Sequence, residues 1–295
     1  LVQRGGTAVI SGDNFQISFD TSRGTISQCS VGETELLARG PLLNVWRAPT
    51  DNDGFKKAPD WRSDKDLTAW LAAGLNEVTH TVESVQVAQT ADHEVQIRVA
   101  TIIESAKVPE AFLHRQTVTI TGDGAVEIGN DVKTKLDLNL PRVGLSLQLP
   151  SGFEQFRWYG RGPVENYRDR KVGTAVGLYS STVDEQYVPY IMPQENGNKT
   201  DVRWLSLTNE DGVGLKVTAD SSLMEASVSH YSADELFKAM HTNELTRQDA
   251  VILNIDHAQA GLGGASCGPA TLPQYRLQAG DYTFSFRLQP ARLTT

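Results

Sequence analysis

The chain has 295 residues, of which 39% are hydrophobic and 21% charged, so it holds enough apolar material for a packed core and has no signature of disorder. Lys and Arg total 27 against 36 Asp and Glu, and the net charge of −9 disfavours nucleic acid as a partner, because such a surface repels phosphate. The two cysteines, Cys29 and Cys267, are too few for a disulfide scaffold and lack neighbours at metal-ligand spacing, so we expect free thiols and no metal site.

No apolar run approaches the ~20 residues of a membrane span, and no signal-peptide pattern opens the chain, so we expect no membrane partner. A start at Leu1 rather than Met indicates a mature product or a domain of a longer parent. The compartment is not determined by the sequence.

Period-two alternation of apolar and polar residues recurs along the whole chain, in short runs bounded by Gly, Asp, Asn and Pro. This pattern predicts an all-β protein of antiparallel strands, each burying one face. No linker or internal repeat marks a boundary, so we expect one domain over residues 1–295, built as a large antiparallel β-sandwich. The clearest apolar faces are Phe15, Ile17 and Phe19; Val95, Ile97 and Val99; Val143, Leu145, Leu147 and Leu149; and Tyr282, Phe284, Phe286 and Leu288.

Two segments are predicted to be helical. Residues 66–73 place apolar side chains on one face and end at Gly74, and a short helix is predicted to begin at Ser232, where Glu235 completes a capping box. Residues 121–124, Thr-Gly-Asp-Gly, predict a tight hairpin between two strands.

The first chemically dense segment is residues 46–54, Trp-Arg-Ala-Pro-Thr-Asp-Asn-Asp-Gly. Arg47 is predicted to pair with Asp51 or Asp53, and Asn52 adds an amide. The segment either presents polar groups to a sugar or to another domain, or is a turn braced internally by Arg47. A calcium loop is excluded, because the glutamate at its twelfth position is missing.

The second segment, residues 158–170, is rich in glycine, aromatic residues and alternating charge, which predicts a structured loop. Glu165 is predicted to pair with Arg168, and Asp169 with Arg170 or Arg161. A structural network is favoured over catalysis. Its candidate residues are Arg161, Glu165, Asn166, Tyr167, Asp169 and Arg170.

The third segment, residues 188–197, sets two prolines around Tyr190 and then a polar turn. Glu195 and Asn196 are candidates for recognition of hydroxyl groups, and the alternative is a rigid loop that turns at Asn196 and Gly197.

The fourth segment, residues 254–269, is a strand end that runs into a glycine-rich loop. Its candidates are His257 and Cys267. A nucleophilic Cys–His pair would need the two side chains within hydrogen-bond reach, and the absence of an oxyanion-hole signature favours a packed or loop-lining cysteine.

Together, these four segments resemble, in the same order, the C-terminal domain of bacterial family 2 β-galactosidases, which also occurs as a separate small chain. The most specific matches are Trp-Arg-Ala-Pro-Thr-Asp-Asn-Asp at 46–53, Gly-Arg-Gly-Pro-Val-Glu-Asn-Tyr-Arg-Asp-Arg at 160–170, Pro-Tyr-Ile-Met-Pro-Gln-Glu-Asn-Gly at 189–197, and Gly-Leu-Gly-Gly at 261–264.

The resemblance implies a supersandwich similar to galactose mutarotase. It also implies that hydrolysis of β-galactosides such as lactose is performed by two glutamates on a separate (β/α)₈ barrel, so that no catalytic residue lies in this chain. The barrel portion, the galactoside and further copies of the parent are the implied partners. Such enzymes commonly use Mg and Na ions in other domains, and no cofactor is expected in this chain.

The resemblance further implies that a loop of this domain reaches the rim of the active site, where a tryptophan of other members stacks on the sugar. This sequence departs from that pattern at Ser266, Cys267 and Gly268, where Cys267 or Gly268 stands in place of the ring. Substrate affinity or acceptor preference is therefore expected to differ.

Two other functions are compatible with the residues. A mutarotase-like epimerase would use a histidine such as His230, His241 or His257 with a carboxylate. A plain carbohydrate-binding module would use exposed aromatic residues such as Trp61, Trp158 or Trp204.

Overall fold

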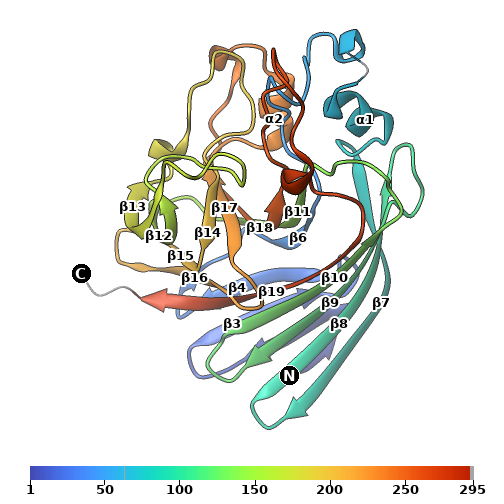
Figure 1. Cartoon of the computed structure of the whole chain (residues 1–295). Coiled ribbons are helices and arrows are strands. Elements are labelled where there is room, and N and C mark those ends of the chain that lie inside the picture. Colours follow the sequence, from blue (N-terminus) through green and yellow to red (C-terminus); the bar gives the residue numbers. More distant parts are fainter. Residues whose placement is uncertain (63, 293–295) are drawn as a thin grey trace.

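The structure is a computed structural model, and it describes residues 1–62 and 64–292. Its strands form three antiparallel sheets joined by long loops and short helices (Figure 1). The large antiparallel β-sandwich predicted from the alternation is therefore confirmed.

The largest sheet has nine strands in the order β13-β12-β15-β16-β19-β10-β9-β8-β7. Its strands are β7 (Val78–Ala91), β8 (Glu94–Ser105), β9 (Phe112–Thr121), β10 (Val126–Thr134), β12 (Gln155–Gly162), β13 (Ala175–Thr182), β15 (Trp204–Thr208), β16 (Val213–Ala219) and β19 (Asp281–Arg292).

Two five-stranded sheets complete the sandwich, and a hydrogen bond of 2.9 Å from Thr25 Oγ1 to the carbonyl of Pro41 shows that they adjoin. One consists, in order, of β1 (Val2–Arg4), β2 (Thr7–Ser11), β3 (Phe15–Asp20), β4 (Thr25–Val31) and β5 (Thr34–Glu35). The other consists, in order, of β14 (Lys199–Val202), β17 (Met224–Ser229), β18 (Val251–Gln259), β11 (Arg142–Leu149) and β6 (Arg39–Asn44).

Apolar side chains from all three sheets pack into one core. Strand β18 shows the principle, because Val251, Leu253 and Ile255 are fully buried in this core while the intervening Asn254 points to the opposite side of its sheet. Each fully buried aliphatic side chain contributes about 1.5–3 kcal/mol. Burial of the apolar side chains that the sequence alternation places on one face of each strand is thus the main source of the fold's stability.

Both predicted helices are present. Helix α1 (Asp66–Ala72) buries Leu67 and Trp70 and is followed by Gly74 at φ +67°, where the left-handed backbone favours glycine. Helix α2 (Ala233–Lys238) begins with the predicted capping box between Ser232 and Glu235. Four short 3-10 helices span Pro59–Arg62, Asp184–Gln186, Thr242–Glu244 and Pro273–Tyr275. Among residues 1–62 and 64–292, no helix has the length and apolar character needed to cross a membrane.

Candidate functional site

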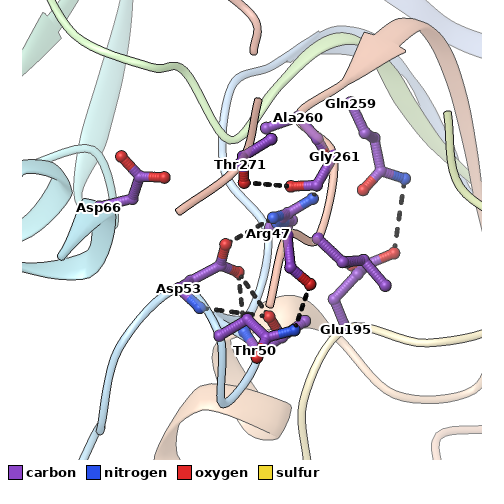
Figure 2. Close-up of polar contacts among 12 residues, drawn as sticks. Arg47, Thr50, Asp53, Asp66, Glu195, Gln259, Ala260, Gly261 and Thr271 are labelled. Carbon is purple, nitrogen blue, oxygen red and sulfur yellow. Dashed lines mark hydrogen bonds and ion pairs between the residues drawn. The ribbon is translucent and has the colours of Figure 1, made fainter. Parts of the chain in front are cut away.

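A buried ion pair holds the first motif. Arg47 is fully buried in the loop after β6, and its Nη2 donates to Asp53 Oδ1 at 2.7 Å (Figure 2). Its Nη1 donates to the carbonyl of Ala260 at 2.7 Å, so the same guanidinium also reaches the fourth motif. Burial alone would lower the pKa of Arg47, but the neighbouring charge of Asp53 raises it above its usual value. Arg47 therefore fixes the first motif against the end of β18.

The glycine-rich loop after β18 is held by side chains from two other motifs. Asp169 Oδ1 and Oδ2 accept the backbone N–H groups of Leu262 and Gly263 at 3.0 and 2.7 Å. Asn52 donates to the carbonyl of Gly263 at 2.9 Å and accepts from the N–H and hydroxyl of Ser266 at 3.0 and 2.6 Å. These bonds give the loop a defined path.

Glycine is required at position 263 for a steric reason. Its φ is +63°, and a Cβ there would lie 2.7 Å from the hydroxyl of Thr271. Beyond this turn, Ser266, Cys267 and Gly268 are exposed, so the segment forms an open edge of the site.

Glu165 joins the second motif to the third. Its carboxylate accepts from the backbone N–H of Gly197 at 2.9 Å, from the hydroxyl of Tyr190 and from the guanidinium of Arg170. The first and third motifs meet through Gln194, whose Oε1 accepts from the N–H of Asp51 at 3.1 Å and whose Nε2 donates to Asp51 Oδ2 at 3.3 Å.

Glu195 lies in a buried charged cluster. Arg142 Nη2 is 3.3 Å from Glu195 Oε1 and 3.2 Å from Asp256 Oδ2. Burial raises the pKa of Asp256 to about 8, although the charge of Arg142 acts in the opposite direction. Gln259 Nε2 donates to the same oxygen of Glu195 at 3.5 Å (Figure 2).

All four motifs meet at one cavity of about 200 Å³, which we call the motif cavity. The hydroxyl of Tyr167, which lines it, is buried without a hydrogen-bond partner in the described part of the chain. Burial raises the pKa of Tyr167 well above its usual value, and Glu195 adds to the effect, so the hydroxyl keeps its proton. The cavity is lined by Thr50, Asp51, Asn52, Tyr167, Arg170, Tyr190, Gln194, Glu195, Leu262 and Ser266.

Ten candidate residues lie outside this lining, and six of them belong to the contacts or to the open edge described above: Arg47, Asp53, Glu165, Asp169, Cys267 and Gly268. The other four are Arg161, Asn166, Asn196 and His257. Arg161 pairs with Asp201 at 2.5 Å, and Asn166 holds Thr200 through its side-chain oxygen. Asn196 closes its turn by accepting from the N–H of Val188 at 3.0 Å.

The fourth of these is His257, whose ring stacks on Phe284 with centroids 5.4 Å apart. Its Nδ1 has no hydrogen-bond partner among the described residues, and no hydrogen bond there joins the ring to Cys267. A Cys–His nucleophile is therefore not formed.

For the second motif, the predicted partners of Glu165 and Asp169 are wrong. Glu165 pairs with Arg170 rather than Arg168, and Arg168 Nε instead lies 3.7 Å from Glu225. Asp169 pairs with neither Arg170 nor Arg161, because two backbone N–H groups of the glycine-rich loop occupy its two oxygens. Two amide donors satisfy a carboxylate without the loss of rotamer freedom that a second long side chain brings.

The carboxylates of the motifs are all engaged in internal bonds. Asp51 accepts from Gln194, Asp53 from Arg47, Glu165 from Tyr190, Asp169 from backbone amides, and Glu195 from Arg142. A retaining glycosidase needs two carboxyl groups about 5–5.5 Å apart on either side of the sugar, one of them free to attack. In this arrangement the motif carboxylates hold the four motifs together.

Several residues of this network are not among the sequence candidates. Tyr190 and Gln194 lie inside the third motif, and an aromatic and an amide group close to Glu195 are the sequence signal for them. Arg142 and Asp256 lie within strands. Each is a charged residue at a position that the alternation turns away from the core, and this is the only feature of the sequence that indicates them.

Comparison with known proteins agrees with the fold and the motifs. A putative aldose 1-epimerase from Escherichia coli K12 superposes with a TM-score of 0.50 over 97% of this chain and 99% of that one, at 10% sequence identity. The fold is thus the galactose mutarotase-like supersandwich that the resemblance implied. Residues 11–288 match the family described as "Beta galactosidase small chain". The chain therefore belongs to the β-galactosidase small-chain family.

Two β-galactosidases illustrate the relationship. The enzyme of Priestia megaterium is 34% identical over 287 residues, which cover 96% of this chain and 26% of that protein. The enzyme of Vibrio cholerae is 35% identical over 291 residues, which cover 97% of this chain and 27% of that protein. The chain thus spans about a quarter of the length of these relatives.

Proposed function

We propose that this chain is the C-terminal part of a retaining β-galactosidase, in which it completes the rim of the sugar site and contributes surface for assembly. The acid and the nucleophile are two glutamates of a (β/α)₈ barrel that lies outside these 295 residues. Any Mg and Na ions of the whole enzyme are bound in its other domains. Terminal β-galactosides such as lactose are the substrates.

The observation that carries this proposal is a hydrogen-bonded network of motif side chains that borders an exposed loop segment. The carboxylates of the motifs are engaged in internal bonds, whereas Ser266, Cys267 and Gly268 are exposed at the end of a loop that the first and second motifs hold in place. A loop fixed in this way can contribute contacts to a site on a neighbouring domain without losing conformational entropy on binding.

The test is hydrolysis of a chromogenic β-galactoside by the chain alone and after addition of the barrel portion. We expect no turnover by the chain alone and recovery of activity in the mixture. Heat-denatured chain serves as the control for recovery. Hydrolysis by the chain alone at an efficiency typical of enzymes would overturn the proposal.

Epimerase activity is the second candidate, because the chain shares the fold of the E. coli protein described above. The identity of 10% supports the fold alone. Of the histidines considered, His230 is buried and its Nε2 lies 3.0 Å from Glu154 and 2.9 Å from Arg247, within a salt-bridge cluster. Exchange NMR between the anomers of galactose distinguishes the two functions, because the β-galactosidase proposal predicts no acceleration by the chain.

A further inference from the structure

A second hollow, of about 260 Å³, lies on the sheet of β17, β18, β11 and β6, on the side turned away from the core. We call it the sheet-face hollow. Two rows of directly opposed residues form its floor. The first row is Ser229, Ile252, Gln148 and Arg39, and the second is Ser227, Asn254, Ser146 and Leu42.

This floor is unusually polar for a covered sheet face. Of its eight positions, all but Ile252 and Leu42 are polar, whereas Leu147 and Leu253 on the other side of the same strands are fully buried in the core. A sheet face that served only to pack α2 and its loop would gain stability from apolar residues. The polar rows therefore indicate a face that meets a polar occupant.

Some polar side chains of the floor are hydrogen-bonded to neighbouring residues, and others are not. Asn254 accepts from Asn44 at 3.2 Å and donates to Ser227 at 3.2 Å, which fixes the middle of the floor. The side chains of Ser146, Gln148 and Arg39 have no hydrogen bond or ion pair to any residue within 1–62 and 64–292. Together they present an amide, a hydroxyl and a planar guanidinium to one space, which is the donor and acceptor set that vicinal hydroxyl groups require.

The walls add an apolar surface and little net charge. Tyr231 and Leu236 line the hollow and offer apolar surface to the C–H groups of a ring. His80 lines the hollow too, and burial lowers its pKa to about 4, so its ring is neutral at neutral pH. The charge of Arg142 is opposed by that of Glu195, 3.3 Å away. Arg39 carries the unpaired charge of the floor, but its side chain is exposed and solvent screens that charge. The hollow therefore favours a neutral ligand over an anion or a cation.

We propose that the sheet-face hollow is a binding site for a neutral saccharide, with Gln148, Ser146 and Arg39 contacting the hydroxyl groups of one hexose ring. Its volume is slightly below the range of about 300–1,000 Å³ usual for drug-sized ligands, which fits a ligand of a single ring. Glu195 lines both this hollow and the motif cavity, so the two spaces share one carboxylate. The proposal concerns binding and goes beyond the proposed hydrolytic function.

The test is titration of the chain with D-galactose and with D-glucose, followed by NMR of methyl groups and by calorimetry. We expect saturable binding in the millimolar range, with shifts of the Ile252 and Leu236 methyl signals. Gln148→Leu and Ser146→Val each fill the floor with apolar atoms and should weaken binding about ten-fold or more. Gln86→Leu, the same change on an exposed position of β7, is the matched control and should leave binding unchanged.

Each outcome decides the proposal. Loss of binding in Gln148→Leu or Ser146→Val, with an unchanged melting temperature and unchanged binding in Gln86→Leu, supports it. If neither sugar binds the unmodified chain even at sugar concentrations far above the millimolar range, the proposal is wrong. It is equally wrong if binding survives in both floor variants, because the sugar then binds elsewhere. Since no hydrolysis is measured, these results are independent of the β-galactosidase proposal.

Discussion

The carboxylate of Asp169 accepts the backbone N–H of Gly263 at 2.7 Å, although 94 residues separate them in the chain. Its other oxygen accepts from Leu262 at 3.0 Å. One side chain of the second motif thus sets the path of the loop that carries Cys267. The conformation of the exposed edge depends on a residue that does not belong to it.

The first prediction concerns this contact. In Asp169→Asn, one oxygen and its charge are lost, and a hydrogen bond to a charged acceptor contributes about 1.5–3 kcal/mol. Amide hydrogen exchange at Leu262 and Gly263 should accelerate about ten-fold or more. In the enzyme reassembled with its barrel portion, KM for a galactoside should rise more than kcat falls, because the loop becomes less well positioned.

Asp281→Asn is the matched control for this change. Asp281 is an exposed partner of Lys133 at 3.1 Å on β19, and its side chain makes no bond to the loop within the described residues. It should alter neither the exchange rates nor KM. Unchanged exchange at Leu262 and Gly263 in Asp169→Asn would show that the loop is held by other contacts.

The second prediction concerns the buried pair of Arg47 and Asp53. Asp53→Asn leaves a buried guanidinium without its counter-charge, and breaking such a pair costs about 3–5 kcal/mol. Urea unfolding followed by tryptophan fluorescence should show a decrease of this size in the free energy of unfolding. Glu110→Gln breaks an exposed pair with Lys135 and should change the midpoint little. Equal effects of the two substitutions would contradict the structural role of Arg47.

The sequence predicted the fold well because its determinants are local. Alternation in Leu145, Leu147 and Leu149 marks a strand whatever it pairs with, and the capping box of Ser232 and Glu235 depends on a spacing of three residues. These expectations were confirmed.

The partners within the site could be predicted less well, because they depend on segments far apart in the chain. Arg170 is adjacent to Asp169, yet Asp169 bonds to amides of the glycine-rich loop and Arg170 bonds to Glu165. Composition identified the residue types of the site, and only the folded arrangement decides which donor reaches which acceptor. Arg142 illustrates the same limit, since nothing in its strand indicates that Glu195 and Asp256 approach it.

The third prediction is an acid-induced loss of stability that depends on His114. Its ring is buried and bonds to Asn130 at 3.0 Å, and burial lowers its pKa from 6.5 to about 4. Because the folded pKa is depressed, the stability from this group is present above about pH 6.5 and is lost as the pH falls toward 4. Between these values the unmodified chain should lose about 3 kcal/mol more than His114→Gln, whose amide can still donate to Asn130.

Urea unfolding at a series of pH values measures this difference. The exposed His93 provides the control, because His93→Gln should leave the pH dependence as it is in the unmodified chain. Parallel curves for His114→Gln and the unmodified chain would show that the ring is not held neutral by burial.

The fourth prediction concerns the two thiols. Cys267 is exposed, whereas Cys29 is buried and burial raises its pKa to about 12, which suppresses the reactive thiolate. A maleimide should modify one thiol per native chain and two after unfolding, as counted by mass spectrometry. Cys267→Ser should abolish labelling of the native chain. Labelling of Cys29 in the native chain would contradict its burial.

The fifth prediction follows from the exposed place of Cys267 on the open edge. If this edge borders the sugar, an aromatic ring at position 267 adds a stacking surface that a thiol lacks. An aromatic contact is worth about 0.5–1.5 kcal/mol, so Cys267→Trp should lower KM for a galactoside by about two- to twelve-fold in the reassembled enzyme. Because the position is exposed, the larger side chain displaces no packed atoms and should leave the melting temperature unchanged. Cys267→Ser removes the thiol without adding a ring and should leave KM as it is. An unchanged KM in Cys267→Trp would place this edge away from the sugar and would count against the rim function, whereas a gain confined to the tryptophan variant ties the fourth motif to substrate binding.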